Sequence, residues 1–346
     1  MKRIRQFFFI ALIFLISACK KETLDLNVKD HFFLENDGAT MPVFVNGNTK
    51  SKVFLIYLHG GPGSTSLEAY QNENSPFKKL QSDYAMVYWE QRCSGSSQGN
   101  CSNLTISQYV KDLEKVIILL KSRYDSDIKF FLIGHSWGGS LGIKFLTTNN
   151  NQNTIKGWIE VGGGHNVPRI VNLEREMVNE IGKRQISQGN NVSQWQANIT
   201  KANSLNLNNV DELFEMNKIA VNSEQLMQKV DSVNQKIGNP YLSDYFLGPL
   251  DNQAASINNE QTFEAMKNEL AVLNLSKNTS KITIPTLLIW GRFDFRVPPL
   301  FAQESLIAYG SAQKELLIFD RSAHYAQWNE PEQFFEKVRN FIEQNK

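Results

Sequence analysis

The stretch Phe130-Phe-Leu-Ile-Gly-His-Ser-Trp-Gly138 sets a serine between a short apolar run and a segment with helical spacing that continues to about Thr147. Residues 134–138 match the pattern G-x-S-x-G, whose glycines permit a sharp strand-to-helix turn that exposes the serine hydroxyl at the edge of a sheet. The pattern alone is weak, and a simple glycine turn is the alternative. With a strand before it and a helix after it, the pattern predicts Ser136 as a nucleophile.

Further apolar runs on both sides of this stretch indicate strands buried on both faces of a sheet. They occupy residues 53–58, 85–89, 155–161, 285–290 and 315–319, and helical segments are expected at 106–120, after Pro298 and at 331–343. Strands that alternate with helices predict the α/β class, with a mostly parallel sheet flanked by helices.

The chain changes character between residues 165 and 278, where Asn, Gln, Glu and Lys are frequent and strand-like runs are missing. Amphipathic stretches at 170–181 and 213–230 indicate helices. We therefore expect a helical cap at 165–278, inserted into a core made of 30–164 and 279–346. In parallel sheets of this kind, function gathers beyond the carboxyl ends of the strands.

A serine hydroxyl needs a base, and the chain has five histidines. His324 directly follows the last predicted strand and is the predicted general base, with a satisfied surface histidine as the alternative. His31 falls in a predicted hairpin near the N-terminus, and His59 is expected to shape its own glycine-rich loop. His135 is expected to point away from the reaction centre, and His165 to line the pocket at the start of the cap.

The orienting acid is predicted to be Asp294, in the stretch Gly291-Arg-Phe-Asp294 that follows a strand. Its role would be to hold the histidine ring and to stabilise the imidazolium form. Asp320 competes for this role, but it ends a strand and is expected to cap a turn. The order Ser136, Asp294, His324 matches the order of nucleophile, acid and base that follows such a serine elbow.

An oxyanion hole requires two backbone N–H donors beside the nucleophile. Trp137 follows the serine and is the first predicted donor. The second is Gly61 in the loop His59-Gly-Gly-Pro-Gly63, with Gly60 as the alternative. The chemistry needs no cofactor, and the sequence shows no metal-ligand cluster.

These motifs together resemble the prolyl aminopeptidase (proline iminopeptidase) group of α/β-hydrolases. That group carries H-G-G-P-G, then D-Q-R-G-x-G-x-S, then a G-x-S-W-G elbow, and the corresponding stretches here are 59–63, 90–97 and 134–138. The resemblance implies the α/β-hydrolase fold with an inserted cap, and an enzyme that releases N-terminal residues, with proline as a candidate, from short peptides. The departures are Glu90 for Asp, Cys93 for Gly, and His135 where many members have Gly.

Acids of the cap bind the free amino terminus of the substrate in this group. This cap offers several glutamates, most of which are expected to lie on solvated helix faces, so none is assigned: Glu174, Glu176, Glu180, Glu212 and Glu215. An esterase, amidase or lactonase of the same fold stays open as the alternative function, and an inactive ligand-binding module as a remote one. The expected partner is a small peptide or ester. A net charge of +1 gives no reason to expect nucleic acid.

The N-terminus has the layout of a secretory signal, with three cations in residues 1–5 followed by an apolar run to Ala18. The run is too short to span a bilayer, which takes roughly 20 residues. Ile16-Ser-Ala-Cys19 resembles the lipobox of bacterial lipoproteins. We expect a signal peptide at 1–18, a lipidated Cys19 with a tether at 19–29, and an exported protein anchored to a bacterial membrane; an ordinary cleaved signal is the alternative.

Two cysteines remain after Cys19. Cys93 and Cys101 lie eight positions apart in a loop rich in Gly, Ser and Asn. In an oxidising compartment we expect them to form a disulfide, with two unrelated thiols as the alternative.

Overall fold

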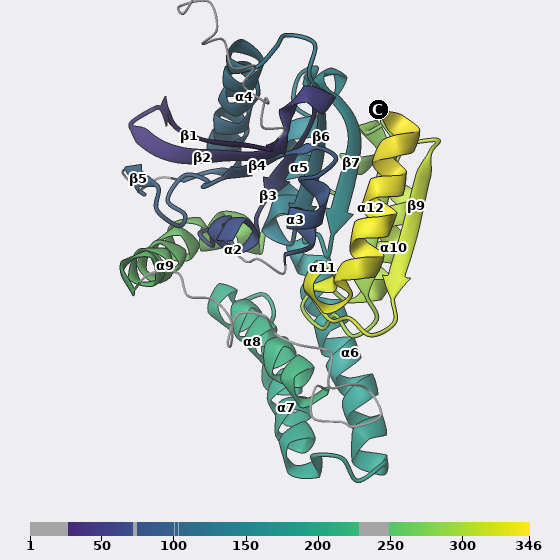
Figure 1. Ribbon diagram of the computed structural model, residues 1–346. Coiled ribbons are helices and arrows are strands. Elements are labelled where there is room, and N and C mark those ends of the chain that lie inside the picture. The colour runs from purple at the N-terminus through teal and green to yellow at the C-terminus, as the bar shows by residue number, and fades with distance from the viewer. Residues whose placement is uncertain (1–26, 72–74, 100, 103, 228–248) are drawn as a thin grey trace, which may run out of the picture.

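The computed structural model describes residues 27–71, 75–99, 101–102, 104–227 and 249–346 (Figure 1). The predicted signal peptide, Cys19 and most of the predicted tether lie outside the described residues. The first strand begins at Asn27, so residues 27–29 belong to the sheet and not to a tether. In the described part of the chain, no helix combines the length and the apolar character that crossing a membrane requires.

Nine strands form one sheet in the described residues, in the order β1-β2-β4-β3-β6-β7-β8-β9, with β5 paired to β2. The pairs from β4 to β9 are parallel, whereas β1 and β2 form an antiparallel hairpin whose second strand pairs antiparallel with β4. The strands are β1 Asn27–Asn36, β2 Ala39–Asn48, β3 Val53–Leu58, β4 Ala85–Trp89, β5 Gln98–Gly99, β6 Lys129–His135, β7 Ile155–Val161, β8 Thr286–Gly291 and β9 Lys314–Phe319. This arrangement confirms the predicted mostly parallel sheet.

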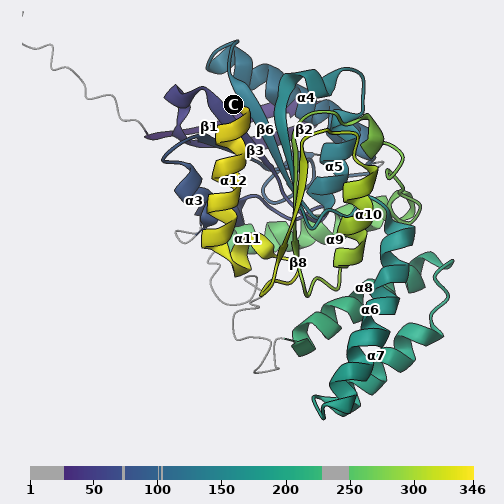
Figure 2. The same cartoon turned by 90° about the vertical axis from the view of Figure 1, so that its right-hand side faces the viewer.

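Helices cover both faces of the sheet, as the alternation of strands and helices predicted (Figures 1 and 2). Successive strand residues point to opposite faces. Ile56 therefore packs in the core on the side of α4, α5 and α10, and Leu55 in the core on the side of α3 and α12. The core helices are α2 Leu67–Gln71, α3 Pro76–Leu80, α4 Ile106–Arg123, α5 Trp137–Leu146, α10 Pro299–Ala308, α11 Ala326–Asn329 and α12 Pro331–Asn345, with 3-10 turns η1 Thr49–Ser51, η2 Asn151–Thr154 and η4 Thr279–Lys281.

The described part of the segment between β7 and β8 is mostly helical. It contains α6 Val167–Ser187, α7 Val192–Ser204, α8 Val210–Met227 and α9 Pro249–Ala271. The first three helices share an apolar cluster of their own around Trp195 and Met216. The helix α9 returns to the core, where a side chain at Gly63 would meet Asn259 and Thr262 (Figure 1).

The two ends of this helical segment are joined side by side. Asn166 and Asn274 form an isolated antiparallel bridge. The amide of Val167 donates to the carbonyl of Leu273 at 2.9 Å, and the amide of Leu275 donates to the carbonyl of His165 at 2.8 Å. We call this pair of segments, residues 165–167 and 273–275, the neck. Because the neck closes on itself, the insertion leaves the sheet and returns to it at one place.

Candidate active site

Ser136 lies at the junction of β6 and α5, in a backbone conformation that side chains other than glycine rarely adopt. Its φ is 55° and its ψ is −115°. Such a conformation costs about 1–3 kcal/mol and persists only where the surroundings enforce it. Here the amide of Ser136 donates to the carbonyl of Val161 at 3.0 Å, and its carbonyl accepts from Gly139 at 2.9 Å and from Gly164 at 3.2 Å.

The glycines of the elbow are required by close packing. A Cβ at Gly134 would overlap the ring of Trp158, and a Cβ at Gly138 would overlap the backbone of Leu58. The elbow is therefore pressed against the neighbouring strands β3 and β7. Ser136 is held at the carboxyl edge of the sheet, where the sequence predicted it.

The predicted base and acid come together from the loops after β9 and β8. His324 Nδ1 lies 2.9 Å from Asp294 Oδ2, and both side chains are buried. The other carboxylate oxygen of Asp294 accepts from the amides of Arg296 at 3.0 Å and Val297 at 2.8 Å. Asp320, the competing acid, instead pairs with Arg292 on the exposed surface.

Burial acts on the two members of this pair in opposite directions, because it disfavours the charged form of each. It raises the pKa of Asp294. The amides of Val297 and Arg296 and the positive charge of Arg296 lower that pKa, but by less than burial raises it. Burial lowers the pKa of His324 well below its ordinary value of 6.5, and the Arg296 guanidinium lowers it further. A neutral imidazole is the form that can accept a proton.

Ser136 and His324 line one cavity of about 520 Å³, together with Gly60, Gly61 and Trp137. Trp137 is the first residue of α5, so its amide has no partner within the helix. Gly60 approaches the serine closely, since a Cβ on it would lie 3.4 Å from that of Ser136. The cavity thus contains the residues predicted as nucleophile, base and oxyanion donors.

Two histidines lie elsewhere than their sequence positions suggested. His135 lines the cavity, and its Nε2 lies 3.0 Å from the carbonyl oxygen of His324. It does not point away, because the loop that carries His324 packs directly on the end of β6. His165 is buried behind the cavity, with Nδ1 3.0 Å from Glu160 Oε1, so the expectation that it lines the pocket was wrong. The buried Glu160 carboxylate needs partners, and His165 and the hydroxyl of Tyr309 supply them, one to each oxygen.

The other two histidines behave as expected. The Nδ1 of His59 lies 2.8 Å from the carbonyl of Gly60, so the ring shapes its own loop. The ring of His31 stacks on Phe44 in the N-terminal hairpin, with centroids 4.3 Å apart.

Glu174 is the one cap glutamate among those named above that the structure buries in the cavity. One carboxyl oxygen accepts from Asn217 at 2.7 Å, and the other has no partner among the described residues. Burial raises the pKa of Glu174 well above its ordinary value. The remaining four are exposed or half-buried: Glu176, Glu180, Glu212 and Glu215.

The helical spacing could have identified Glu174. Ile170, Val171 and Val178 lie three or four positions away from it and form the buried face of α6. A second buried acid, Glu224, was missed entirely; it lies 3.7 Å from Arg296, and burial raises its pKa to about 7.

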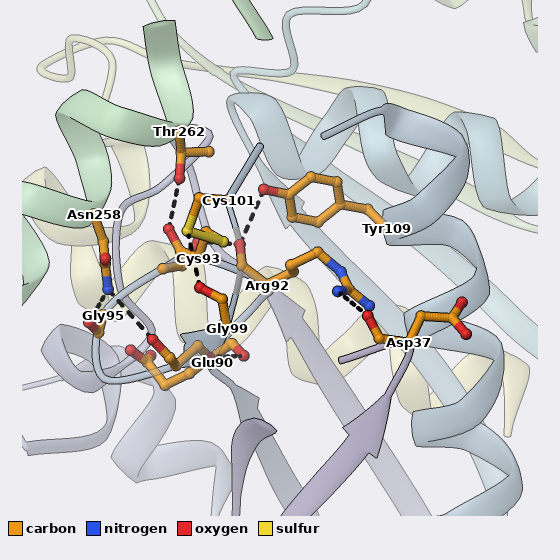
Figure 3. The surroundings of a disulfide bond; sticks show 12 residues. Asp37, Glu90, Arg92, Cys93, Gly95, Gly99, Cys101, Tyr109, Asn258 and Thr262 are labelled. Atoms are coloured by element: carbon orange, nitrogen blue, oxygen red, sulfur yellow. Dashed lines mark hydrogen bonds between the residues drawn. A yellow bond between two sulfur atoms is a disulfide. The ribbon is translucent and has the colours of Figure 1, made fainter. Parts of the chain in front are cut away.

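Cys93 and Cys101 are joined by a disulfide with 5.7 Å between their Cα atoms (Figure 3). The loop that it closes is bound by the helix α9, since Thr262 Oγ1 donates to the carbonyl of Cys93 at 2.6 Å and Asn258 donates to the carbonyl of Gly95 at 2.8 Å. The disulfide loop thus connects the core to the last helix of the insertion. Among the described residues, no group of three or more His, Cys, Asp or Glu side chains could hold a metal ion.

Comparison with known proteins gives one family and several relatives. The profile of the family described as alpha/beta hydrolase fold matches residues 53–331. A proline iminopeptidase of Saccharolobus solfataricus is 27% identical over 303 residues, which cover 84% of this chain and 84% of that protein. Among solved structures, a proline iminopeptidase of Mycobacterium smegmatis has a TM-score of 0.64 at 15% identity, over 91% of this chain and 98% of that one. An esterase from Exiguobacterium antarcticum has a TM-score of 0.58 at 17% identity, over 91% of this chain and 100% of that one.

Proposed function

This chain belongs to the α/β-hydrolase fold family, and we propose that it is a serine hydrolase that releases N-terminal residues from short peptides. One observation carries the proposal. His324, which is bonded to Asp294 at 2.9 Å, lines the same cavity as Ser136, and Ser136 is held in a strained elbow. Nucleophile, base and orienting acid in this order and geometry are the machinery of acyl transfer.

The proposed reaction begins when Ser136 attacks the carbonyl carbon of the substrate and His324 Nε2 takes its proton. Asp294 accepts from His324 Nδ1, which keeps Nε2 free to act as the base and stabilises the imidazolium. Trp137 and Gly61, or Gly60, donate to the oxyanion. His324 then gives the proton to the leaving amine, and water activated by His324 releases the acyl group by the same steps in reverse order.

Glu174 supports a substrate with a free amino terminus. Its second carboxyl oxygen is buried in the cavity without a partner among the described residues, and such a group is costly unless a ligand satisfies it. An ammonium group would supply donors for that oxygen. The resemblance to prolyl aminopeptidases, in which cap acids bind the amino terminus, points in the same direction, as do the relatives named proline iminopeptidase.

An esterase function is the second candidate, because burial raises the pKa of Glu174 well above its ordinary value. A raised pKa disfavours the carboxylate form, to which an ammonium group binds most strongly, whereas an ester without an amine needs no such partner. Esters also have better leaving groups than amides, so a less exact site suffices for them.

The deciding experiment compares three chromogenic substrates: proline p-nitroanilide, its N-blocked form and p-nitrophenyl acetate. We expect the free prolyl anilide to be cleaved and the blocked form to be resistant. Glu174→Gln should raise KM for the free anilide by roughly 10- to 100-fold, because a hydrogen bond between charged groups is lost, and should leave acetate hydrolysis unchanged. The matched control is Glu176→Gln, on the exposed side of the same helix.

The blank is Ser136→Ala, which should reduce turnover of every substrate by about 10⁴-fold or more while the thermal unfolding temperature is retained. Cleavage of the acetate alone would establish the esterase function. Full turnover by a folded Ser136→Ala variant would contradict the serine mechanism itself.

A further inference from the structure

Gln91 lies where the two chain segments of the proposed oxyanion hole meet. It follows β4 and is completely buried. Its side-chain nitrogen donates to the carbonyl of His59 at 3.3 Å, and its side-chain oxygen accepts from the indole Nε1 of Trp137 at 3.0 Å. Its backbone amide donates to the Nε2 of His59 at 3.4 Å. One residue therefore joins the loop that carries Gly60 and Gly61 to the residue that follows the nucleophile.

These contacts determine the direction of the loop amides. In a planar trans peptide the C=O and the N–H point in opposite directions. The carbonyl of His59 belongs to the same peptide unit as the N–H of Gly60, so the bond from Gln91 fixes where that N–H points. The ring of His59 accepts from the Gln91 amide at Nε2, which leaves Nδ1 as the donor to the carbonyl of Gly60. That second bond fixes the direction of the Gly61 N–H.

Gln91 is itself held between two rigid neighbours. Glu90 accepts from the hydroxyl and amide of Ser66 at 2.5 Å each, and from the amide of Ser96 at 3.1 Å. Arg92 forms a buried ion pair with Asp112 at 2.7 Å. The side chain of Gln91 does not line the cavity, so any effect on the reaction passes through His59 and Trp137.

We propose that Gln91 is a positioning residue of the hydrolase, whose side-chain amide sets the relative placement of the two oxyanion donors. The inference rests on the proposed serine hydrolase function. It concerns the transition state and not substrate binding, because the oxyanion forms only after the attack of Ser136. Loss of Gln91 should therefore lower kcat and leave KM nearly unchanged.

The experiment measures kcat, KM and the rate of labelling by a fluorophosphonate for four variants. Gln91→Met keeps the size of the side chain but removes both amide bonds, and should lower kcat and the labelling rate by about 10- to 100-fold, with KM within about twofold. Trp137→Phe removes the indole donor but keeps the backbone N–H, and should have a smaller effect. The double variant should be no slower than Gln91→Met, since both changes break the same connection.

The control is Gln185→Met, which removes a buried glutamine that accepts from Asn190 in the cap, away from the cavity. It should lose thermal stability and keep kcat. Equal kcat losses in the Gln91 and Gln185 variants would overturn the proposal. So would additive effects of the Gln91 and Trp137 changes on kcat. A labelling rate for Gln91→Met within twofold of the wild-type rate would overturn it as well. A wild-type protein that is neither labelled nor active would overturn the serine hydrolase function, and this inference with it.

Discussion

At the scale of single residues, the charge state of His324 decides when the proposed reaction can run. The ring must be neutral to accept the proton of Ser136, and activity is lost as the pH falls through its pKa. Burial and the nearby Arg296 guanidinium hold that pKa well below 6.5. The kcat/KM for an uncharged ester should therefore stay level through pH 6.5 and decline only in more acidic solution.

Arg296→Gln tests the electrostatic part of this argument. Removing a positive charge makes the imidazolium less costly, so the pKa of His324 rises and the acid limb of the kcat/KM profile moves to higher pH. The matched control is Arg292→Gln, whose guanidinium pairs with Asp320 on the surface and should leave the limb in place. An acid limb that does not move in the Arg296 variant would refute the role of its charge.

At the scale of the element, the disulfide loop explains one departure from the family pattern. Cys93 stands where the prolyl aminopeptidase group has glycine, and its φ is 52°, in the left-handed region that favours glycine. A cysteine there costs about 1–2 kcal/mol, and the disulfide offsets that cost. The same loop receives the hydrogen bonds of Thr262 from α9.

Opening this loop should therefore affect both stability and activity. Replacing Cys93 and Cys101 by serine should lower the free energy of unfolding by about 2–3 kcal/mol, the chain-entropy value for so short a loop, and should also reduce kcat. Denaturant unfolding and steady-state kinetics on residues 27–346 would measure both. A reducing agent should lower the unfolding free energy and kcat of the wild type by the same amounts, and should not lower those of the double serine variant further. If reduction lowered both quantities equally in the wild type and in the double variant, the disulfide would be excluded as the cause.

At the scale of the whole molecule, much of the architecture could be predicted because strand and helix periods are local properties of the sequence. The residues of the proposed triad, Ser136, Asp294 and His324, could be picked out because each follows a recognisable strand. The orientations of His135 and His165 could not, because they depend on the His324 carbonyl and the Glu160 carboxylate, which other strands and loops bring near. The contacts of these two histidines depend on how segments of the chain pack together, so a short sequence pattern cannot predict them.

We further propose that the chain is exported and held at a membrane through a lipid on Cys19, as the lipobox-like stretch predicts. Expressed in full in a bacterium, the protein should enter the detergent phase on phase separation and incorporate labelled palmitate. Cys19→Ala should lose both properties, whereas Ser17→Ala, which keeps a small residue in the motif, should retain them. Equal palmitate labelling of the Cys19 variant would rule out this anchor.

The neck has a consequence for how such a protein can diversify. Because residues 165–167 and 273–275 bond to each other, the two ends of the insertion meet at one place on the sheet, and α9 makes a second contact with the core at the disulfide loop. Recombination can exchange the inserted segment, with Glu174 and the other cap residues that line the cavity, while the strands that hold Ser136 and His324 keep their register. A change of specificity can thus come from replacing one inserted segment, while the core residues proposed for the reaction stay in place.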